Sequence, residues 1–151
     1  IAKAKPNATL DDVILAAKAA QIHDFIMKLP QGYDTIASQR GTNLSGGEKQ
    51  RITIARAILR DTPIIVLDEA TAFADPQNEE KIIKALSNLI IGKTTIIIAH
   101  RLSTIKHADK ILVFERGKII QSGTHEDLIQ KGLYKQLWQK YEDSQNWGIK
   151  K

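Results

Sequence analysis

The chain has 151 residues, enough for one domain with a core, and 42% of them are hydrophobic, as in ordinary globular proteins. Its 22 basic and 17 acidic residues give a net charge of +5, and the basic residues are scattered, which favours a solvated surface over a dedicated nucleic-acid face. The absence of cysteine excludes disulfides and thiolate metal sites. The longest apolar runs, Ile64 to Leu67 and Ile96 to Ala99, are too short to cross a bilayer.

Two short helices are predicted in the first part of the chain. Thr9 with Asp12 three residues later is an N-cap pattern, and the apolar residues after it favour a helix ending near Gln21. A second helical stretch, His23 to Leu29, should end at the turn formed by residues 30–33. His23 is expected to pack or to cap a helix.

Residues 44–50, Leu-Ser-Gly-Gly-Glu-Lys-Gln, precede and open a helix predicted over Glu48 to Arg60. Ser45 and Glu48 form a capping box that needs no ligand, so the pattern alone leaves a purely structural role open. The adjacent Gly46 and Gly47 reduce helix stability and favour the close approach of another backbone or of a phosphate. Together with the helix N-terminus, they predict an anion-binding site.

The apolar run that ends at Leu67 predicts a parallel strand buried on both faces, followed by the carboxylates Asp68 and Glu69. Ligands bind at the carboxyl ends of strands in open α/β sheets. Because neighbouring side chains on a strand alternate in direction, one carboxylate can hold Mg²⁺ while the next orients a water molecule. The alternative is a strand end with ordinary solvated charges.

A crossover helix is predicted from Asp75 to Gly92, and a second buried strand from Thr94 to Ala99, ending in His100. His100 therefore also lies at the predicted ligand edge. The residues Gly-Lys-Thr at 92–94 do not form a P-loop, because the pattern G-x-x-x-x-G-K-[ST] needs a glycine where Ser87 stands.

The last third predicts a β-hairpin, a short capped helix and an amphipathic helix. The hairpin strands are 110–115 and 118–122, and the helix cap begins at Thr124. His125 is expected to belong to this cap. The final helix, 133–141, has Trp138 on its apolar side, and core packing or a partner surface would explain that side equally well.

These motifs resemble the second half of an ATP-binding cassette, the nucleotide-binding domain of ABC transporters. Four segments carry the resemblance: the signature motif at Leu44–Glu48, the Walker B strand with its catalytic glutamate at Ile64–Glu69, the D-loop at Ala72–Asp75, and the switch histidine within Ile98–Arg101. The likeness runs from about Pro6 to Tyr141. Residues 25–35 and 98–105 are similar to exporter-type cassettes, which are usually fused to a membrane domain.

The resemblance implies an α/β fold with a partial P-loop NTPase (RecA-like) core and an α-helical signature subdomain. We expect the helical signature subdomain over residues 1–60, the C-terminal part of the α/β ATPase core over 61–130, and a C-terminal helix and tail over 131–151. The complete domain would bind ATP and Mg²⁺ between two cassettes arranged head to tail.

The resemblance also assigns roles to individual residues. Asp68 would assist the metal Mg²⁺. The catalytic residues would be Glu69, which would position the attacking water, and His100, which would contact the γ-phosphate. The cofactor-binding residues would be Ser45, Gly46, Gly47, Glu48 and Asp75, and the first three would reach the ATP held by the partner cassette.

Three motifs depart from the family pattern. The signature motif commonly ends in Gln, whereas Glu48 adds a negative charge near a phosphate site. The loop from Asp34 to Gly41, which senses the membrane domain in the family, has Gln39 where a glutamate is usual. The D-loop reads Ala-Phe-Ala-Asp instead of Ser-Ala-Leu-Asp, as in some exporters linked to siderophore handling.

The family's adenine-stacking aromatic, Walker A P-loop and Q-loop would all precede Ile1, which is not an initiator methionine. We therefore expect a C-terminal fragment, inactive alone, of an ATPase that powers export or transport across a membrane. The expected partners are a second nucleotide-binding domain, identical or different, and a transmembrane domain fused upstream. The expected location is the cytoplasmic face of the cell membrane, with no nucleic acid bound.

Two other interpretations stay open. A soluble ABC ATPase acting on nucleic acid or the ribosome is supported only by the net charge of +5. An interaction module would use the aromatic side chains after Gly132 as its contact.

Overall fold

The computed structural model describes residues 1–36, 44–68, 76–99 and 102–147. The chain forms two units, residues 1–96 and 97–151, and each unit contains a hydrophobic core of its own. Within the described ranges, no helix is both long and apolar enough to span a bilayer.

The helical elements described before the first strand are η1 (Ala2–Ala4), α1 (Leu10–Ala19), α2 (His23–Met27), η2 (Gly32–Asp34) and α3 (Gly46–Arg60). Of these, α1 and α3 begin directly after the predicted cap residues Thr9 and Ser45. The capping box at α1 is confirmed: the Asp12 backbone N–H donates to Thr9 Oγ1 (3.2 Å), and the Thr9 N–H donates to Asp12 Oδ2 (2.9 Å). The bonds from the Thr9 backbone and then from its hydroxyl lower the pKa of Asp12.

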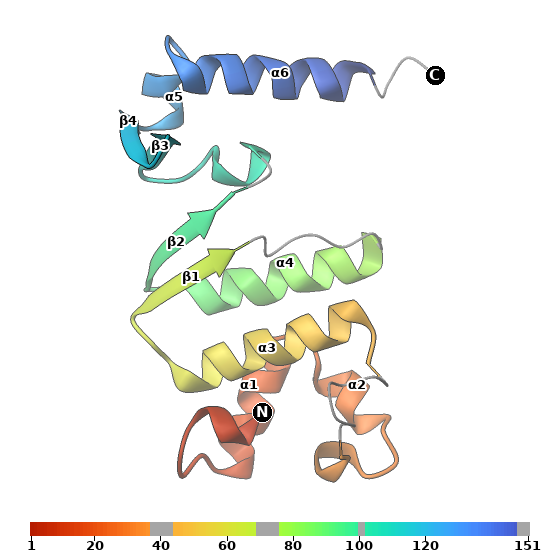
Figure 1. Cartoon of the computed structure of the whole chain (residues 1–151). Coiled ribbons are helices and arrows are strands. Elements are labelled where there is room, and N and C mark those ends of the chain that lie inside the picture. Colours follow the sequence, from red (N-terminus) through yellow and green to blue (C-terminus); the bar gives the residue numbers. More distant parts are fainter. Residues whose placement is uncertain (37–43, 69–75, 100–101, 148–151) are drawn as a thin grey trace. The chain divides into compact units, whose positions relative to one another are not determined.

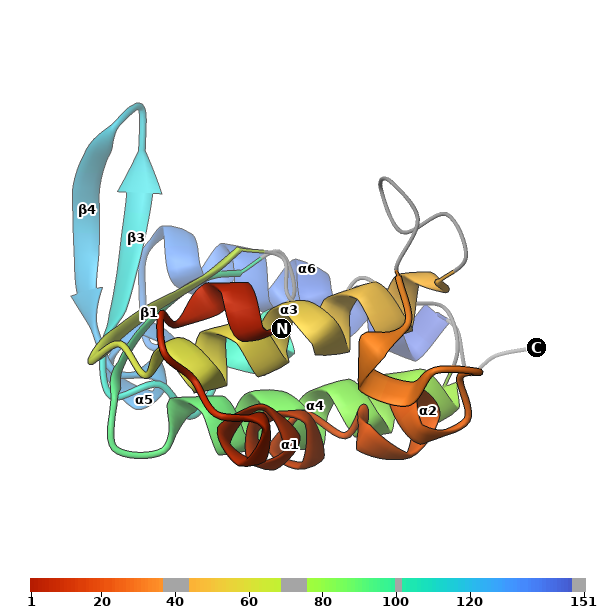
Figure 2. The ribbon, with the colours of Figure 1, turned by 90° about the horizontal axis from the view of Figure 1, so that it is seen from below.

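Helix α3 is the central element of the first unit, because it contacts both α1 and α4 (Pro76–Ile90) (Figures 1 and 2). The buried residues that these helices share with α2 and the first strand are Ala17, Ala20, Ile22, Ile26, Ile54, Ala55, Ile65, Ile82, Ala85 and Leu89. Four of the ten are alanines, and small side chains at contact positions let helix axes approach closely. The position of α3 is thereby fixed from two sides.

Strands β1 (Ile64–Asp68) and β2 (Thr94–Ile98) pair in a two-stranded sheet, and α4 connects them along the chain (Figure 1). The predictions that β1 is buried on both faces and that β2 is a buried strand are wrong for this chain. In β1, Ile65 is 7% exposed but Val66 is 60% exposed, and the isoleucines of β2 are also exposed. Alternate side chains point to opposite faces, and the helical core of this unit covers the face of β1 that carries Ile65.

The second unit is built on the predicted hairpin. After η4 (Leu102–Ile105), strands β3 (Ile111–Glu115) and β4 (Lys118–Gly123) pair antiparallel, from Ile111 opposite Gly123 to Glu115 opposite Lys118. Arg116 and Gly117 form the turn with φ angles of 49° and 76°. Positive φ at both central residues matches the right-handed twist of the strands, which confirms the predicted connection.

Helices α5 (His125–Leu128) and α6 (Leu133–Trp147) complete the core of the second unit. The capping box between Thr124 and Asp127 is confirmed. His125, however, is a buried residue whose Nδ1 lies 2.9 Å from the Tyr134 hydroxyl. Tyr134 and Trp138 are buried as well, so core packing explains these two aromatic side chains of α6.

Candidate functional site

The first turn of α3 holds four of the predicted site residues. Ser45 is the N-cap: its Oγ accepts from the Glu48 backbone N–H (3.3 Å), and its own N–H donates to Glu48 Oε2 (2.7 Å). The capping box is therefore formed without any ligand. Gly46 is exposed and Gly47 is buried, and helix geometry gives their backbone N–H groups no acceptor within the helix.

The hydroxyl of Ser45 differs from those of the other two capping boxes. The Thr9 and Thr124 hydroxyls each donate to the carboxylate of their own box, Asp12 and Asp127, at 2.8 Å. Glu48, by contrast, accepts from the Ser45 backbone N–H, and no acceptor for the Ser45 hydroxyl hydrogen occurs among the described residues. This hydroxyl can donate to an external anion while it keeps its capping bond.

Gly47 lies where α3 meets α4. A Cβ atom at this position would stand 3.1 Å from Asn78 Cγ and 3.2 Å from Asn78 Oδ1. The Asn78 amide is itself held by Arg51, whose Nη1 donates to Asn78 Oδ1 at 2.8 Å. The double glycine predicts the close approach of another group. At Gly47 this group is the Asn78 side chain of α4, in the same chain.

We expect Gly47→Ala to destabilise the chain relative to Gly46→Ala by about 1 to 2 kcal/mol, because the added methyl must displace a side chain that is already hydrogen-bonded. Both substitutions gain similar helix propensity, up to about 1 kcal/mol. Urea unfolding of the two variants measures the difference. Equal midpoints would show that Asn78 moves aside freely.

Arg51 is a buried charge that the sequence interpretation did not single out. It is 4% exposed, and its Nε atom is buried without a hydrogen-bond partner. Burial lowers the pKa of Arg51, while the nearby negative charge of Glu48 raises it. Its spacing of four residues from both Gly47 and Ala55 is the signal that places it on the packed face of α3.

Asp68 is the last residue of β1, at the carboxyl end of the strand as predicted, and it is exposed. Glu69, Asp75 and His100 lie outside the described residues, as do the D-loop and Gln39. No group of three or more His, Cys, Asp or Glu side chains within the described ranges could hold a metal ion. The roles of Asp68 as a Mg²⁺ residue and of Glu69 and His100 in catalysis therefore stay predictions.

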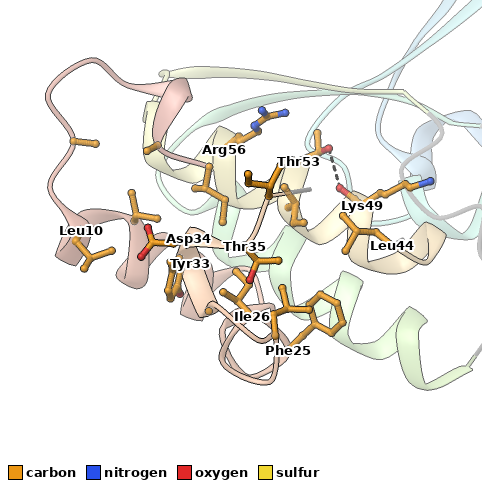
Figure 3. Close-up of a pocket in the computed structure, with 18 of the residues that line it drawn as sticks. Leu10, Phe25, Ile26, Tyr33, Asp34, Thr35, Leu44, Lys49, Thr53 and Arg56 are labelled. Carbon is orange, nitrogen blue, oxygen red and sulfur yellow. Dashed lines mark hydrogen bonds between the residues drawn. The ribbon is translucent and has the colours of Figure 1, made fainter. Parts of the chain in front are cut away.

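A cavity of about 960 Å³ lies between the beginning of the chain, the α2 region and α3. Figure 3 shows Phe25 and Ile26 of α2 and Lys49, Thr53 and Arg56 of α3 around it. Most of its lining is apolar, and Asp34, Thr35 and Ile36, the first residues of the loop that precedes the signature turn, also contribute. The cavity thus combines a mostly apolar lining with the cationic side chains of Lys49 and Arg56 and the carboxylate of Asp34.

Comparison with known proteins gives a consistent picture. A family model described as "ABC transporter" matches residues 2–72. The chain is 56% identical over 140 residues to a mycobactin import ATP-binding/permease protein of Mycolicibacterium smegmatis, covering 92% of this chain and 16% of that protein. It is 57% identical over 130 residues to an ATP-dependent lipid A-core flippase of Acinetobacter baylyi, covering 85% and 23%.

A solved structure has the same fold. It is that of a bacterial Atm1-family ABC exporter with ATP bound, which shares 46% sequence identity with this chain at a TM-score of 0.80. The match covers 92% of this chain and 24% of the exporter chain. The chain therefore spans between about a sixth and a quarter of the length of the relatives it matches.

Proposed function

The chain belongs to the ABC transporter family and has the P-loop NTPase fold of that family's ATPase domain. On this premise, we propose that it forms part of an ATP-hydrolysing domain that powers transport across a membrane. The proposed cofactors are ATP and Mg²⁺. The proposed partners are a second nucleotide-binding domain and a transmembrane domain, which places the chain at the cytoplasmic face of a membrane.

The observation that carries the proposal is the first turn of α3. The hydroxyl of Ser45 and the N–H groups of Gly46 and Gly47 are donors gathered at a helix N-terminus, which favours negative charge. In the proposed dimer these donors bind the γ-phosphate of the ATP held by the partner cassette. Such preorganised donors act on the charge of the transferring phosphoryl group without further rearrangement.

The remaining site residues are assigned to the same reaction. Asp68, at the end of β1, assists Mg²⁺, Glu69 orients the attacking water, and His100 contacts the γ-phosphate. Glu48 and Asp75 complete the cofactor-binding set. The division into a helical signature subdomain (1–60), an α/β part (61–130) and a C-terminal helix and tail (131–151) is part of the same proposal.

The cavity of Figure 3 is the proposed contact with the transmembrane domain. It is lined by the beginning of the segment 34–41, which is the proposed sensor of the membrane domain. Its apolar lining suits a short amphipathic segment, since such segments bind by inserting apolar side chains into a groove. Lys49 and Arg56 at its edge suit acidic residues on that segment.

The proposal is tested with Ser45→Ala in the complete transporter. We expect its ATP turnover at subsaturating ATP to fall by about 10- to 100-fold, because a hydrogen bond to a charged phosphate contributes about 1.5 to 3 kcal/mol. Initial rates of phosphate release by the protein in lipid nanodiscs measure the effect.

Thr124→Ala is the matched control, since it removes the hydroxyl of an equivalent capping box in the second unit, outside the proposed phosphate site and the cavity of Figure 3. Each substitution should reduce helix stability similarly, by about 1 kcal/mol. Turnover should therefore stay near the wild-type value in Thr124→Ala. Equal losses in the two variants would mean that Ser45 acts only as a cap, and the proposed contact with ATP would be wrong.

A further inference from the structure

A second cavity of the first unit, about 440 Å³ in volume, lies among α1, α2, α3 and α4 on the side where Arg51 meets Asn78. We propose that it binds the phosphate group of a small anion, at a position separate from the signature turn. Of the residues Ser45, Gly46, Gly47 and Glu48, only Glu48 lines this cavity. The proposal therefore concerns a different ligand from the ATP of the partner cassette.

The lining of the cavity is predominantly cationic. Lys18, Lys28, Arg51 and Lys81 contribute four positive charges against the two carboxylates Asp24 and Glu48, a net charge of 4 − 2 = +2. Among the described residues, an ion pair forms between Lys93 and Asp61. Lys18, Lys28 and Lys81 form no ion pair with a described carboxylate. Positive charges gathered in a concave site focus their potential on an anion.

Arg51 gives the cavity a positive charge held in one position. The side chain is buried, and its Nη1 atom donates to Asn78 Oδ1 at 2.8 Å, which fixes the guanidinium in the lining of the cavity. The planar guanidinium matches the spacing of phosphate oxygens.

His23 and Phe25 suit a phosphate that carries an organic group. The Nδ1 atom of His23 lies 2.8 Å from the Tyr33 hydroxyl, and both His23 and Phe25 line the cavity. In the tautomer in which Nδ1 accepts the hydroxyl hydrogen, Nε2 carries a hydrogen and can donate. Phe25 adds an aromatic surface that a nucleobase can contact.

The test is a titration of the ¹⁵N-labelled 151-residue chain with inorganic phosphate at constant ionic strength, using chloride as the reference anion. We expect saturable amide shifts around Gln21, His23 and Lys81. Lys81→Gln should weaken phosphate binding about tenfold, since it removes one charged donor. Lys84→Gln, an exposed lysine of the same helix outside the lining, should leave binding unchanged.

A second arm uses AMP to distinguish free phosphate from a phosphate attached to a nucleoside. Tighter binding of AMP with shifts at Phe25 supports a nucleotide as the ligand, and equal affinities support phosphate alone. The proposal is overturned by shifts that do not saturate, by shifts confined to Gly46 and Gly47, or by equal losses in Lys81→Gln and Lys84→Gln.

Discussion

Replacing Glu69 with glutamine in the complete transporter is expected to lower ATP turnover by about 100- to 10,000-fold while ATP still binds. Glutamine keeps the size of the side chain but cannot accept a proton or hold the attacking water as firmly as a carboxylate. Asp68→Asn should behave differently, because the loss of the proposed Mg²⁺ ligand would weaken nucleotide binding as well as turnover. Steady-state phosphate release and binding of labelled ATP separate the two effects.

Two controls make the Glu69 prediction specific. His100→Ala should reduce turnover without the same retention of bound ATP, because it would remove the proposed contact to the γ-phosphate. The 151-residue chain alone should release little phosphate, since its sequence contains no G-x-x-x-x-G-K-[ST] pattern. Turnover within tenfold of wild type in Glu69→Gln would mean that another group orients the water.

The helices and the hairpin could be predicted because their signals are local. Thr9 with Asp12, Ser45 with Glu48 and Thr124 with Asp127 each form the capping box that their spacing predicts. The turn at Arg116 and Gly117 likewise follows from the conformational freedom of its glycine. In each case the interacting groups are at most a few residues apart, so the sequence contains the whole interaction.

Burial and side-chain partners could not be predicted in the same way, because they depend on elements far apart in the chain. The apolar run of β1 indicates burial on two faces, but the helical core meets one face, with Ile65 and Leu67, while Ile64 and Val66 are exposed. Arg51 is buried because Asn78, 27 residues later, accepts its hydrogen bond. His125 has the sequence position of a cap residue, and its burial depends on Tyr134 and Trp138 of α6.

At the signature turn, the sequence left two alternatives open, a capping box or an anion site. The structure contains the capping box and also a hydroxyl hydrogen of Ser45 that the box does not use. The two roles are therefore compatible in one residue. A comparison of hydrogen bonds at Thr9, Ser45 and Thr124 was needed to see this, since all three positions look alike in sequence.

Replacing Trp138 with alanine is expected to lower the stability of the second unit by about 3 to 5 kcal/mol, as for other large aromatic side chains in cores. Trp138 is 8% exposed, its ring centre lies 4.4 Å from that of His125, and its Nε1 donates to Glu142 Oε1 at 2.8 Å. The substitution leaves a void beside His125 and removes packing from β3. Native-state hydrogen exchange measures the loss in the second unit at residues 111–141 and tests the first unit at the amides of α3.

Leu137→Ala is the control on the same helix, because Leu137 is 40% exposed and its truncation should lower stability by less than about 1 kcal/mol. The first unit has a separate core, so amides of α3 should keep their protection in Trp138→Ala. Similar losses in the two variants would show that the hairpin packs against α6 without needing the indole ring. Loss of protection in α3 as well would show that the two units unfold together, so that Trp138 stabilises the whole chain.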